Sequence, residues 1–224
     1  MSSEETKNDL IKSNIFSKEK LKVIHDPILE IKEIRRKLNY KIEKNLLNNK
    51  NYFLNIGRLT KQKNQALLIN VFSKLLKNNN NLYLYIVGDG EKKNILNKMI
   101  LDKKVENNIF LLGYCENVFP LIKKSSAVIS TSLWEDPGAV MIESAYCNKL
   151  VISSDCPNGP EEFLEYGKCG YLFKNNDSVD LENKINLFLN ESENSKFKKA
   201  VISKKNSKMY SLFRHYQKLN KILV

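Results

Sequence analysis

Two carboxylates flank the start of a predicted helix in the segment WEDPGAVMIESA, residues 134–145. Glu135 lies just before a Pro-Gly pair, and Glu143 follows eight positions later, on the second turn of the helix. Carboxylate oxygens accept hydrogen bonds from paired hydroxyl groups, so both acids are candidates for binding a sugar. The alternative is that both are solvated surface acids, as most glutamates are.

The start of this helix is itself a candidate anion site. Pro137 suits the first helical position and Asp136 suits the cap. The residues that follow are small or compact: Gly138, Ala139 and Val140. They leave the N–H groups of the first turn accessible, and these groups together with the helix dipole attract a phosphate.

Two cations follow the first predicted strand in GRLTKQKN, residues 57–64. Gly57 permits a tight exit from the strand. The Arg58 guanidinium can bind phosphate oxygens in pairs and the Lys63 ammonium acts as a point charge, so together they suit a diphosphate. The alternative is two solvated cations in a basic protein. The glycine-flanked GDGE at 88–91 predicts a turn that lets the backbone approach a ligand, although a single G-x-G is a weak signal.

Short apolar runs alternate with helix-sized segments from residue 51 onward. The predicted strands are 51–57, 81–88, 108–113, 127–132, 150–155 and 171–173. The predicted helices are 64–78, 91–103, 117–125, 138–147, 159–165, 178–190 and a long one over 193–222. This order predicts an α/β fold with a Rossmann-like, doubly wound parallel sheet and a long C-terminal helix. Such sheets bind ligands beyond the carboxyl ends of their strands, where the loops described above lie.

Composition is that of a folded protein with a basic tail. The chain has 224 residues and a net charge of +12. From residue 196 onward the ionised side chains are all cationic, in Lys196, Lys198, Lys199, Lys204, Lys205, Lys208, Arg214, Lys218 and Lys221. A basic face suits an anionic partner such as nucleic acid, acidic lipid or a phosphorylated ligand, and an AT-rich genome is the neutral explanation.

Other residue types exclude several classes of protein. Residues 1–50 are polar, with VIHDP at 23–27 predicting a short strand that a proline stops. The four cysteines have unrelated spacings and His25 and His215 have no neighbouring cluster, which predicts reduced thiols, structural histidines and no metal site. Apolar stretches are too short to cross a bilayer and the N-terminus has no apolar signal region, so we expect a cytoplasmic protein.

These motifs together resemble one family. GRLTKQKN, GDGE, the FLLGY loop, the E-x7-E pair and SSDCPNGPEEFLEYGKCGYLF occur in the same order in the C-terminal, donor-binding half of the retaining GT-B glycosyltransferases of family 4. The match runs from about residue 50 to residue 190. Any one of these motifs is weak alone, whereas E-x7-E in this setting is specific.

The resemblance implies a role for each candidate residue. Arg58 and Lys63, beside Gly57, would neutralise the diphosphate of a nucleotide-sugar, most simply a UDP-sugar, without a metal, and no DxD motif is present. The backbone of Gly138, Ala139 and Val140 would bind diphosphate and sugar oxygens. Glu143 would bind the ribose, and Glu135 would be the catalytic-site acid that contacts the transferred sugar. The base would be framed by the loop from Gly113 to Asn117, with Tyr114 and Cys115.

The resemblance also implies an organisation in three parts. Residues 1–50 resemble a remnant of the N-terminal acceptor domain and the interdomain linker, 51–192 the donor-binding domain, and 193–224 a basic C-terminal helix. We expect a truncated or split hexosyl- or N-acetylhexosaminyl-transferase of cell-surface polysaccharide or glycolipid synthesis, with a separate acceptor-domain polypeptide as a possible partner. The basic helix would suit peripheral contact with the anionic inner face of the cell membrane. The alternatives are a non-catalytic nucleotide-sugar-binding or interaction remnant and, on charge alone, a nucleic-acid-binding protein.

Overall fold

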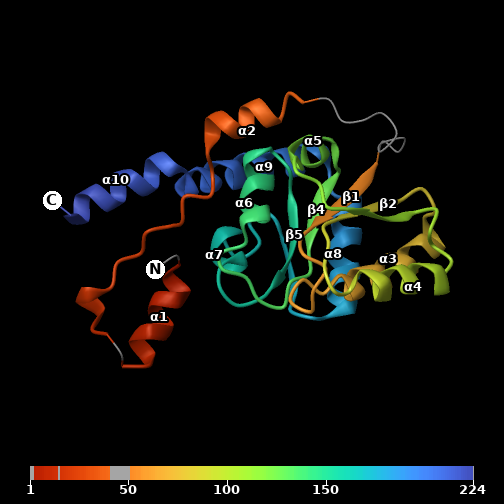
Figure 1. The fold of residues 1–224 in the computed structure, drawn as a ribbon, viewed down its shortest axis with the longest axis horizontal. Helices are drawn as coiled ribbons and strands as arrows, with labels where there is room; N and C mark the ends of the chain where they lie inside the picture. Colours follow the sequence, from red (N-terminus) through yellow and green to blue (C-terminus); the bar gives the residue numbers. More distant parts are fainter. Residues whose placement is uncertain (1–2, 15, 41–50, 224) are drawn as a thin grey trace.

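A parallel sheet forms the centre of the molecule (Figure 1). The computed structural model describes residues 3–14, 16–40 and 51–223. Within them the sheet has six strands in the order β3-β2-β1-β4-β5-β6. The strands are β1 (Tyr52–Ile56), β2 (Tyr83–Val87), β3 (Ile109–Gly113), β4 (Ala127–Ser130), β5 (Val151–Asp155) and β6 (Tyr171–Lys174). Every predicted strand from residue 51 onward is present, and the predicted doubly wound fold is confirmed.

Helices connect the strands and flank them. The N-terminal region contains α1 (Glu4–Lys12), the 3-10 turn η1 (Lys18–Lys20) and α2 (Ile31–Lys37). The crossover helices are α3 (Gln65–Asn78), α4 (Lys93–Asp102), α5 (Phe119–Lys124), α6 (Ala139–Tyr146) and α7 (Pro160–Phe163). The chain ends with α8 (Ser178–Asn190), α9 (Glu193–Ser207), the 3-10 turn η3 (Lys208–Tyr210) and α10 (Leu212–Leu223).

Both faces of the sheet are buried, which explains why its strands are apolar without alternation. Phe53 and Leu84 pack with residues of α3, α4 and α8 on one face. Their chain neighbours Leu54 and Tyr85 pack with residues of α2, α5, α6 and α7 on the other. The strand ends are therefore held between two layers of helices, and the loops that leave them are positioned by a rigid core.

The predicted long C-terminal helix is broken. Instead of one helix over 193–222, α9 ends at Ser207 and α10 begins after η3. Tyr210 is buried in this break, where its ring stacks at 4.6 Å from the His25 ring and meets Phe163 edge-on. Burial of one aromatic ring is worth more than the few helical hydrogen bonds lost there, so packing overrides helix propensity.

The predicted strand at 23–27 is wrong. That segment has no regular structure, and the nearest pairing is a single parallel bridge between Leu29 and Ser211. The extended segment runs beside the start of α10, where a His215 ring nitrogen lies 2.8 Å from the His25 carbonyl oxygen. In Figure 1, α10 leads away from the sheet, and none of its residues is buried. Across the described ranges, no helix combines the length and apolar character that a bilayer crossing needs.

Candidate functional site

The loops at the carboxyl edge of the sheet are tied together by hydrogen bonds. The Leu133 N–H donates to the Gln62 carbonyl at 2.8 Å, and the Thr131 hydroxyl donates to the Lys63 carbonyl at 2.9 Å. The Glu135 N–H donates to the Pro157 carbonyl at 3.2 Å. The loops after β1, β4 and β5 therefore form one frame, although they are far apart in sequence.

The GDGE turn packs backbone to backbone against the loop after β1. A Cβ atom on Gly88 would lie 1.9 Å from the Gly57 carbonyl oxygen, and one on Gly90 would lie 2.6 Å from the Leu59 carbonyl oxygen. Both glycines have positive φ. The Leu59 N–H donates to the Asp89 carbonyl at 2.9 Å. These glycines are needed so that two loops can touch backbone to backbone.

A cavity of about 450 Å³ opens between the tied loops at the ends of β1, β4 and β5. It contains six of the residues predicted for the site, namely Arg58, Lys63, Glu135, Gly138, Ala139 and Val140. Gly57 lies directly beside it, since a Cβ atom there would meet the Lys63 side chain at 3.2 Å. The predicted diphosphate-binding groups and the predicted sugar-binding acid thus share one cavity.

Glu135 is held by two donors at the wall of the cavity. The Lys63 Nζ lies 2.6 Å from its Oε1, and the Ser132 hydroxyl donates to the same oxygen at 2.5 Å. The side chains of Lys63 and Glu135 are only 19% and 11% exposed, so water screens this ion pair weakly. Arg58 lines the cavity beside them, and among the described residues no carboxylate pairs with it. The cavity wall therefore combines two cations, Arg58 and Lys63, with two carboxylates, Glu135 and Asp136.

The helix start differs in detail from the prediction. Pro137 and Asp136 precede α6, joined by a cis peptide bond, and no side chain caps the helix. Gly138 occupies the cap position with φ of 86°, which excludes it from the helix, so α6 begins at Ala139. Two predictions are therefore wrong: Gly138 rather than Asp136 occupies the cap position, and Pro137 lies before the helix rather than at its first position. The Met141 N–H donates to the Gly138 carbonyl at 3.0 Å. The N–H groups of Ala139 and Val140 precede the first intrahelical bond, and this end of α6 lines the cavity.

Glu143 lies outside the cavity lining, on the side of α6 that faces α2. Burial raises the pKa of the Glu143 carboxyl to about 7, and the nearby Lys37 ammonium opposes that shift. Near neutral pH this acid is therefore part ionised. Lys37 was not a predicted site residue, and its position beside Glu143 comes only from the tertiary packing of α2.

The predicted base-framing loop lies apart from the same cavity. Gly113 ends β3 with φ of 73°, and Tyr114 is 77% exposed. The Cys115 thiol donates to the Asn117 carbonyl at 3.3 Å. The Asn117 amide also donates to the Lys37 carbonyl at 3.0 Å, so this loop and α2 are joined. None of the three predicted residues lines the 450 Å³ cavity.

Sequence reasoning did not identify several residues of the cavity region, and three of them make bonds that shape it. Ser132 orients Glu135, and its 1% exposure marks it as part of the frame. Gln62 and Trp134 line the cavity and are joined by a 2.9 Å bond from the Gln62 amide to the Trp134 carbonyl. The one available signal was the single tryptophan of the chain, in the middle of the loop between β4 and α6.

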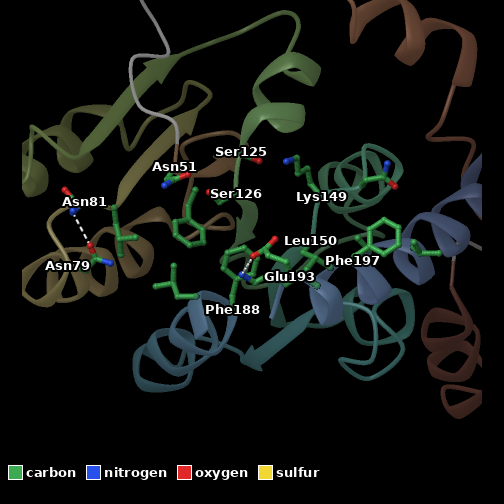
Figure 2. Close-up of a pocket in the computed structure, with 17 residues that line it drawn as sticks. Asn51, Asn79, Asn81, Ser125, Ser126, Lys149, Leu150, Phe188, Glu193 and Phe197 are labelled. Atoms are coloured by element: carbon green, nitrogen blue, oxygen red, sulfur yellow. Dashed lines mark hydrogen bonds and ion pairs between the residues drawn. The ribbon is translucent and has the colours of Figure 1, made fainter. Parts of the chain in front are cut away.

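A wider cavity of about 710 Å³ lies at the opposite, amino edge of the sheet (Figure 2). Its wall combines Asn51, Asn79 and Asn81 with Phe188 and Phe197. No predicted site residue lines it. The larger cavity volume therefore does not mark the predicted site. The predicted site is marked by the charged groups that converge at the carboxyl ends of the strands.

The described residues contain no group of three or more histidines, cysteines, aspartates or glutamates placed to bind a metal ion. The four cysteines are free. The cavity instead provides two cations and a helix N-terminus.

Comparison with known proteins shows the family to which this chain belongs. The model of the family "Glycosyl transferases group 1" matches residues 37–208. The chain therefore belongs to the group 1 glycosyl transferases, which have the GT-B fold.

Two curated relatives and one solved structure are similar over most of the chain. An uncharacterized glycosyltransferase of Methanocaldococcus jannaschii is 37% identical over 182 residues, which cover 74% of this chain and 45% of that protein. N-acetylgalactosamine-N,N'-diacetylbacillosaminyl-diphospho-undecaprenol 4-alpha-N-acetylgalactosaminyltransferase of Campylobacter jejuni is 30% identical over 197 residues, which cover 88% of this chain and 51% of that protein. A structure of S. aureus TarM in complex with fondaparinux, alpha-GlcNAc-glycerol and UDP superposes with a TM-score of 0.81 at 26% identity, covering 98% of this chain and 42% of TarM. The chain thus spans about half the length of these curated relatives, or less.

Proposed function

We propose that this chain is the donor-binding half of a retaining glycosyltransferase of family 4 that transfers a hexose or N-acetylhexosamine from a UDP-sugar. The observation that carries the proposal is the shared cavity of Arg58, Lys63, Glu135 and the first turn of α6. UDP in the related TarM structure and an N-acetylhexosamine in the name of the Campylobacter relative support the choice of donor.

The charges of the cavity suit departure of a nucleoside diphosphate. As the bond to the sugar breaks, negative charge grows on the diphosphate. Once the donor is bound, Arg58, Lys63 and the N–H groups at the start of α6 already face the diphosphate, so they stabilise that charge as it grows. This role needs no metal ion, and we propose that the enzyme uses none.

Binding of the diphosphate changes the partners of Lys63. In the structure the Lys63 ammonium lies 2.6 Å from Glu135 and neutralises it. A diphosphate competes with Glu135 for that ammonium. When Lys63 turns to the diphosphate, the Glu135 carboxylate can accept a hydrogen bond from a hydroxyl of the sugar. Ser132 still donates to Glu135 and keeps the acid oriented. The ion pair thus couples donor binding to the acid that we assign to the transferred sugar.

Glu143 and the 113–117 loop complete the proposed nucleotide site. Glu143 accepts hydrogen bonds from the ribose, and Tyr114 and Cys115 frame the base. Both lie outside the 450 Å³ cavity, toward α2, so the nucleotide would extend from the cavity along α6.

Transfer also needs an acceptor site, because reaction between two bound substrates depends on holding both. We propose a second structural unit that supplies it, either on a longer gene product or on a separate polypeptide. We further propose that the protein acts at the inner face of the cell membrane, with the cations of α10 beside anionic lipids. The domain limits 51–192 and 193–224 stay predictions.

Calorimetry with UDP and UDP-sugars tests the donor site. We expect binding by the wild-type chain and a loss of affinity of about tenfold or more in Arg58→Ala/Lys63→Ala, since each charge-assisted bond to phosphate is worth about 1.5–3 kcal/mol. The matched control is Lys61→Ala/Lys74→Ala, which removes two exposed cations of the same loop and the following helix. A folded wild-type chain that binds no nucleotide, or equal affinity in both double variants, would contradict the proposal.

A further inference from the structure

Four cations surround a second pocket at the amino edge of the sheet. The pocket has a volume of about 290 Å³, and we name it the basal pocket. Its cations are Arg35 of α2, Lys123 of α5, Lys204 of α9 and Lys208 of η3. No acidic residue lines it, and within the described ranges none of the four cations forms an ion pair with a carboxylate.

The remaining lining groups are neutral. Burial raises the pKa of the Cys147 thiol to about 11, so it stays protonated near neutral pH. Tyr146 presents its ring to the Lys204 ammonium at 5.4 Å, and Asn148 contributes an amide. Glu143, one turn back on α6, raises the pKa of Cys147, but its own pKa of about 7 leaves it part ionised. The pocket is therefore rich in hydrogen-bond donors and has no internal counter-ion.

Helix dipoles offer the simplest alternative explanation for these cations. The C-terminal ends of α2, α5, α6 and α9 lie at the pocket, and cations stabilise such ends. Each end carries at most about half a negative charge, so four ends offset at most about two of the four positive charges. The helices α2 and α5 span only 7 and 6 residues, which makes their contribution smaller. About two positive charges or more remain uncompensated.

The neighbouring wider cavity provides a contrast. Asn148 lines both cavities, so they adjoin. In the wider cavity Glu193 lies 2.9 Å from Lys196, and Figure 2 marks this pair by a dashed line. The Glu193 carboxylate therefore neutralises the Lys196 ammonium within the wall of the wider cavity. The basal pocket, by contrast, has four cations and no carboxylate among the described residues of its wall.

We propose that the basal pocket binds a phosphoryl group. Arg35 would bind two of its oxygens through the guanidinium fork, and the three lysines would supply point charges around it. The volume accommodates a phosphate monoester of a small molecule as well as a lipid headgroup phosphate. This site is separate from the donor cavity: the two lie at opposite ends of the eight-residue α6, about 12 Å apart along the helix axis.

Amide NMR of the complete chain tests this site directly. Sodium phosphate is titrated at constant ionic strength in the presence of UDP, and the amide signals of Cys147 and Asn148 are followed. We expect saturable shifts of these signals. They should require about tenfold or more higher phosphate in Lys204→Gln/Lys208→Gln and in Arg35→Gln/Lys123→Gln, because each pair removes two charge-assisted contacts.

The control is Lys198→Gln/Lys205→Gln, which removes two exposed lysines of α9 that do not line the pocket. It should change the phosphate midpoint by less than about twofold. The spectra themselves report whether each variant is folded. Shifts that do not saturate, or equal weakening in the control and in both pocket variants, would overturn the proposal. UDP binding is followed by the amide signals of Ala139 and Val140, and phosphate binding by those of Cys147 and Asn148. If UDP does not bind, the phosphate titration can therefore still be measured.

Vesicles of phosphatidylglycerol identify the source of the phosphoryl group. Cosedimentation that falls in Lys204→Gln/Lys208→Gln but not in Lys198→Gln/Lys205→Gln supports the site with a lipid headgroup as its ligand. Saturable phosphate binding without such a difference supports it with a soluble phosphate.

Discussion

The cavity at the carboxyl edge of the sheet and the basal pocket at the amino edge differ in how their cations are paired. At the carboxyl edge, Lys63 is paired with Glu135 inside a frame of cross-linked loops. At the amino edge, the cations of the basal pocket have no carboxylate partner among the described residues. Helix α6 spans both, with its N-terminus at the donor cavity and its C-terminus at the basal pocket.

The difference shows two ways in which one fold can prepare for an anionic ligand. In the donor cavity the Glu135 carboxylate neutralises Lys63, and a diphosphate must displace it from that ammonium. The basal pocket keeps its cations uncompensated and relies on solvent exposure to tolerate them. The carboxyl edge should therefore be sensitive to single substitutions, and the amino edge should tolerate them.

The largest expected effect is on the frame of the carboxyl edge. Gly88→Ala places a Cβ atom 1.9 Å from the Gly57 carbonyl oxygen at a φ of 141°. We expect a loss of more than about 3 kcal/mol of unfolding free energy, because backbone must move on both sides. Denaturant unfolding measures it. In the control Gly113→Ala, with no atom within 4 Å, strain from positive φ alone should cost about 1–2 kcal/mol. An equal loss of unfolding free energy in Gly88→Ala and Gly113→Ala would show that the frame adjusts to the added Cβ atom and is not rigid.

The next effect concerns Glu143, between the two edges. Its raised pKa of about 7 means that the folded state binds the proton more tightly than the unfolded state, where the pKa is 4.5. The resulting stabilisation is complete below about pH 4.5 and is lost as pH rises through about 7. Relative to Glu143→Gln, the wild type should lose up to about 3 kcal/mol of unfolding free energy across this window.

Unfolding of both proteins between pH 4.5 and pH 8 measures the difference. The exposed Glu116→Gln is the control and should follow the wild type. UDP affinity should change in the opposite direction, rising through about pH 7 as Glu143 becomes a better acceptor for the ribose, and Glu143→Gln should remove that rise. A stability difference that does not vary with pH would contradict the assigned burial of Glu143.

A smaller effect compares two ion pairs of this edge. A double-mutant cycle with Lys63→Met and Glu135→Gln should give a coupling of about 1–2 kcal/mol, because both side chains are largely buried. The control pair, Lys93 and Asp89, has side chains that are 44% and 54% exposed, and its coupling should stay below about 0.5 kcal/mol. Equal couplings would mean that the Lys63 pair is as well solvated as a surface pair.

The smallest effect is expected at the base-framing loop. Tyr114→Ala should leave the unfolding free energy within about 0.5 kcal/mol, because the side chain is 77% exposed, yet weaken UDP binding by about threefold to tenfold. Tyr166→Ala, at 75% exposure, is the matched control and should leave UDP binding unchanged. Unchanged affinity in both variants would remove Tyr114 from the nucleotide site.

Most of the fold could be predicted because the strands are buried on both faces and are therefore apolar throughout. The break at 207–211 could not, since no proline or glycine marks it and only the docking of Tyr210 explains it. The start of α6 was shifted because the conformation of Gly138, not the preceding proline, decides where helical hydrogen bonding begins.

The sequence predicted which residues line the site, but not which residues they contact. Spacing indicated that Arg58, Lys63 and Glu135 lie at strand ends, and they line one cavity. The bond from Ser132 to Glu135 joins residues three positions apart and depends on the conformation of their loop, which the sequence pattern does not specify. The position of Lys37 beside Glu143 depends on the tertiary packing of α2.

A crystal structure of the chain with UDP tests the central claim most directly. We predict the diphosphate at the first turn of α6, within hydrogen-bonding distance of the Ala139 and Val140 N–H groups and of Lys63, with the Lys63 ammonium drawn from Glu135 toward phosphate. A diphosphate bound elsewhere, with the Lys63–Glu135 pair unchanged at 2.6 Å, would contradict it.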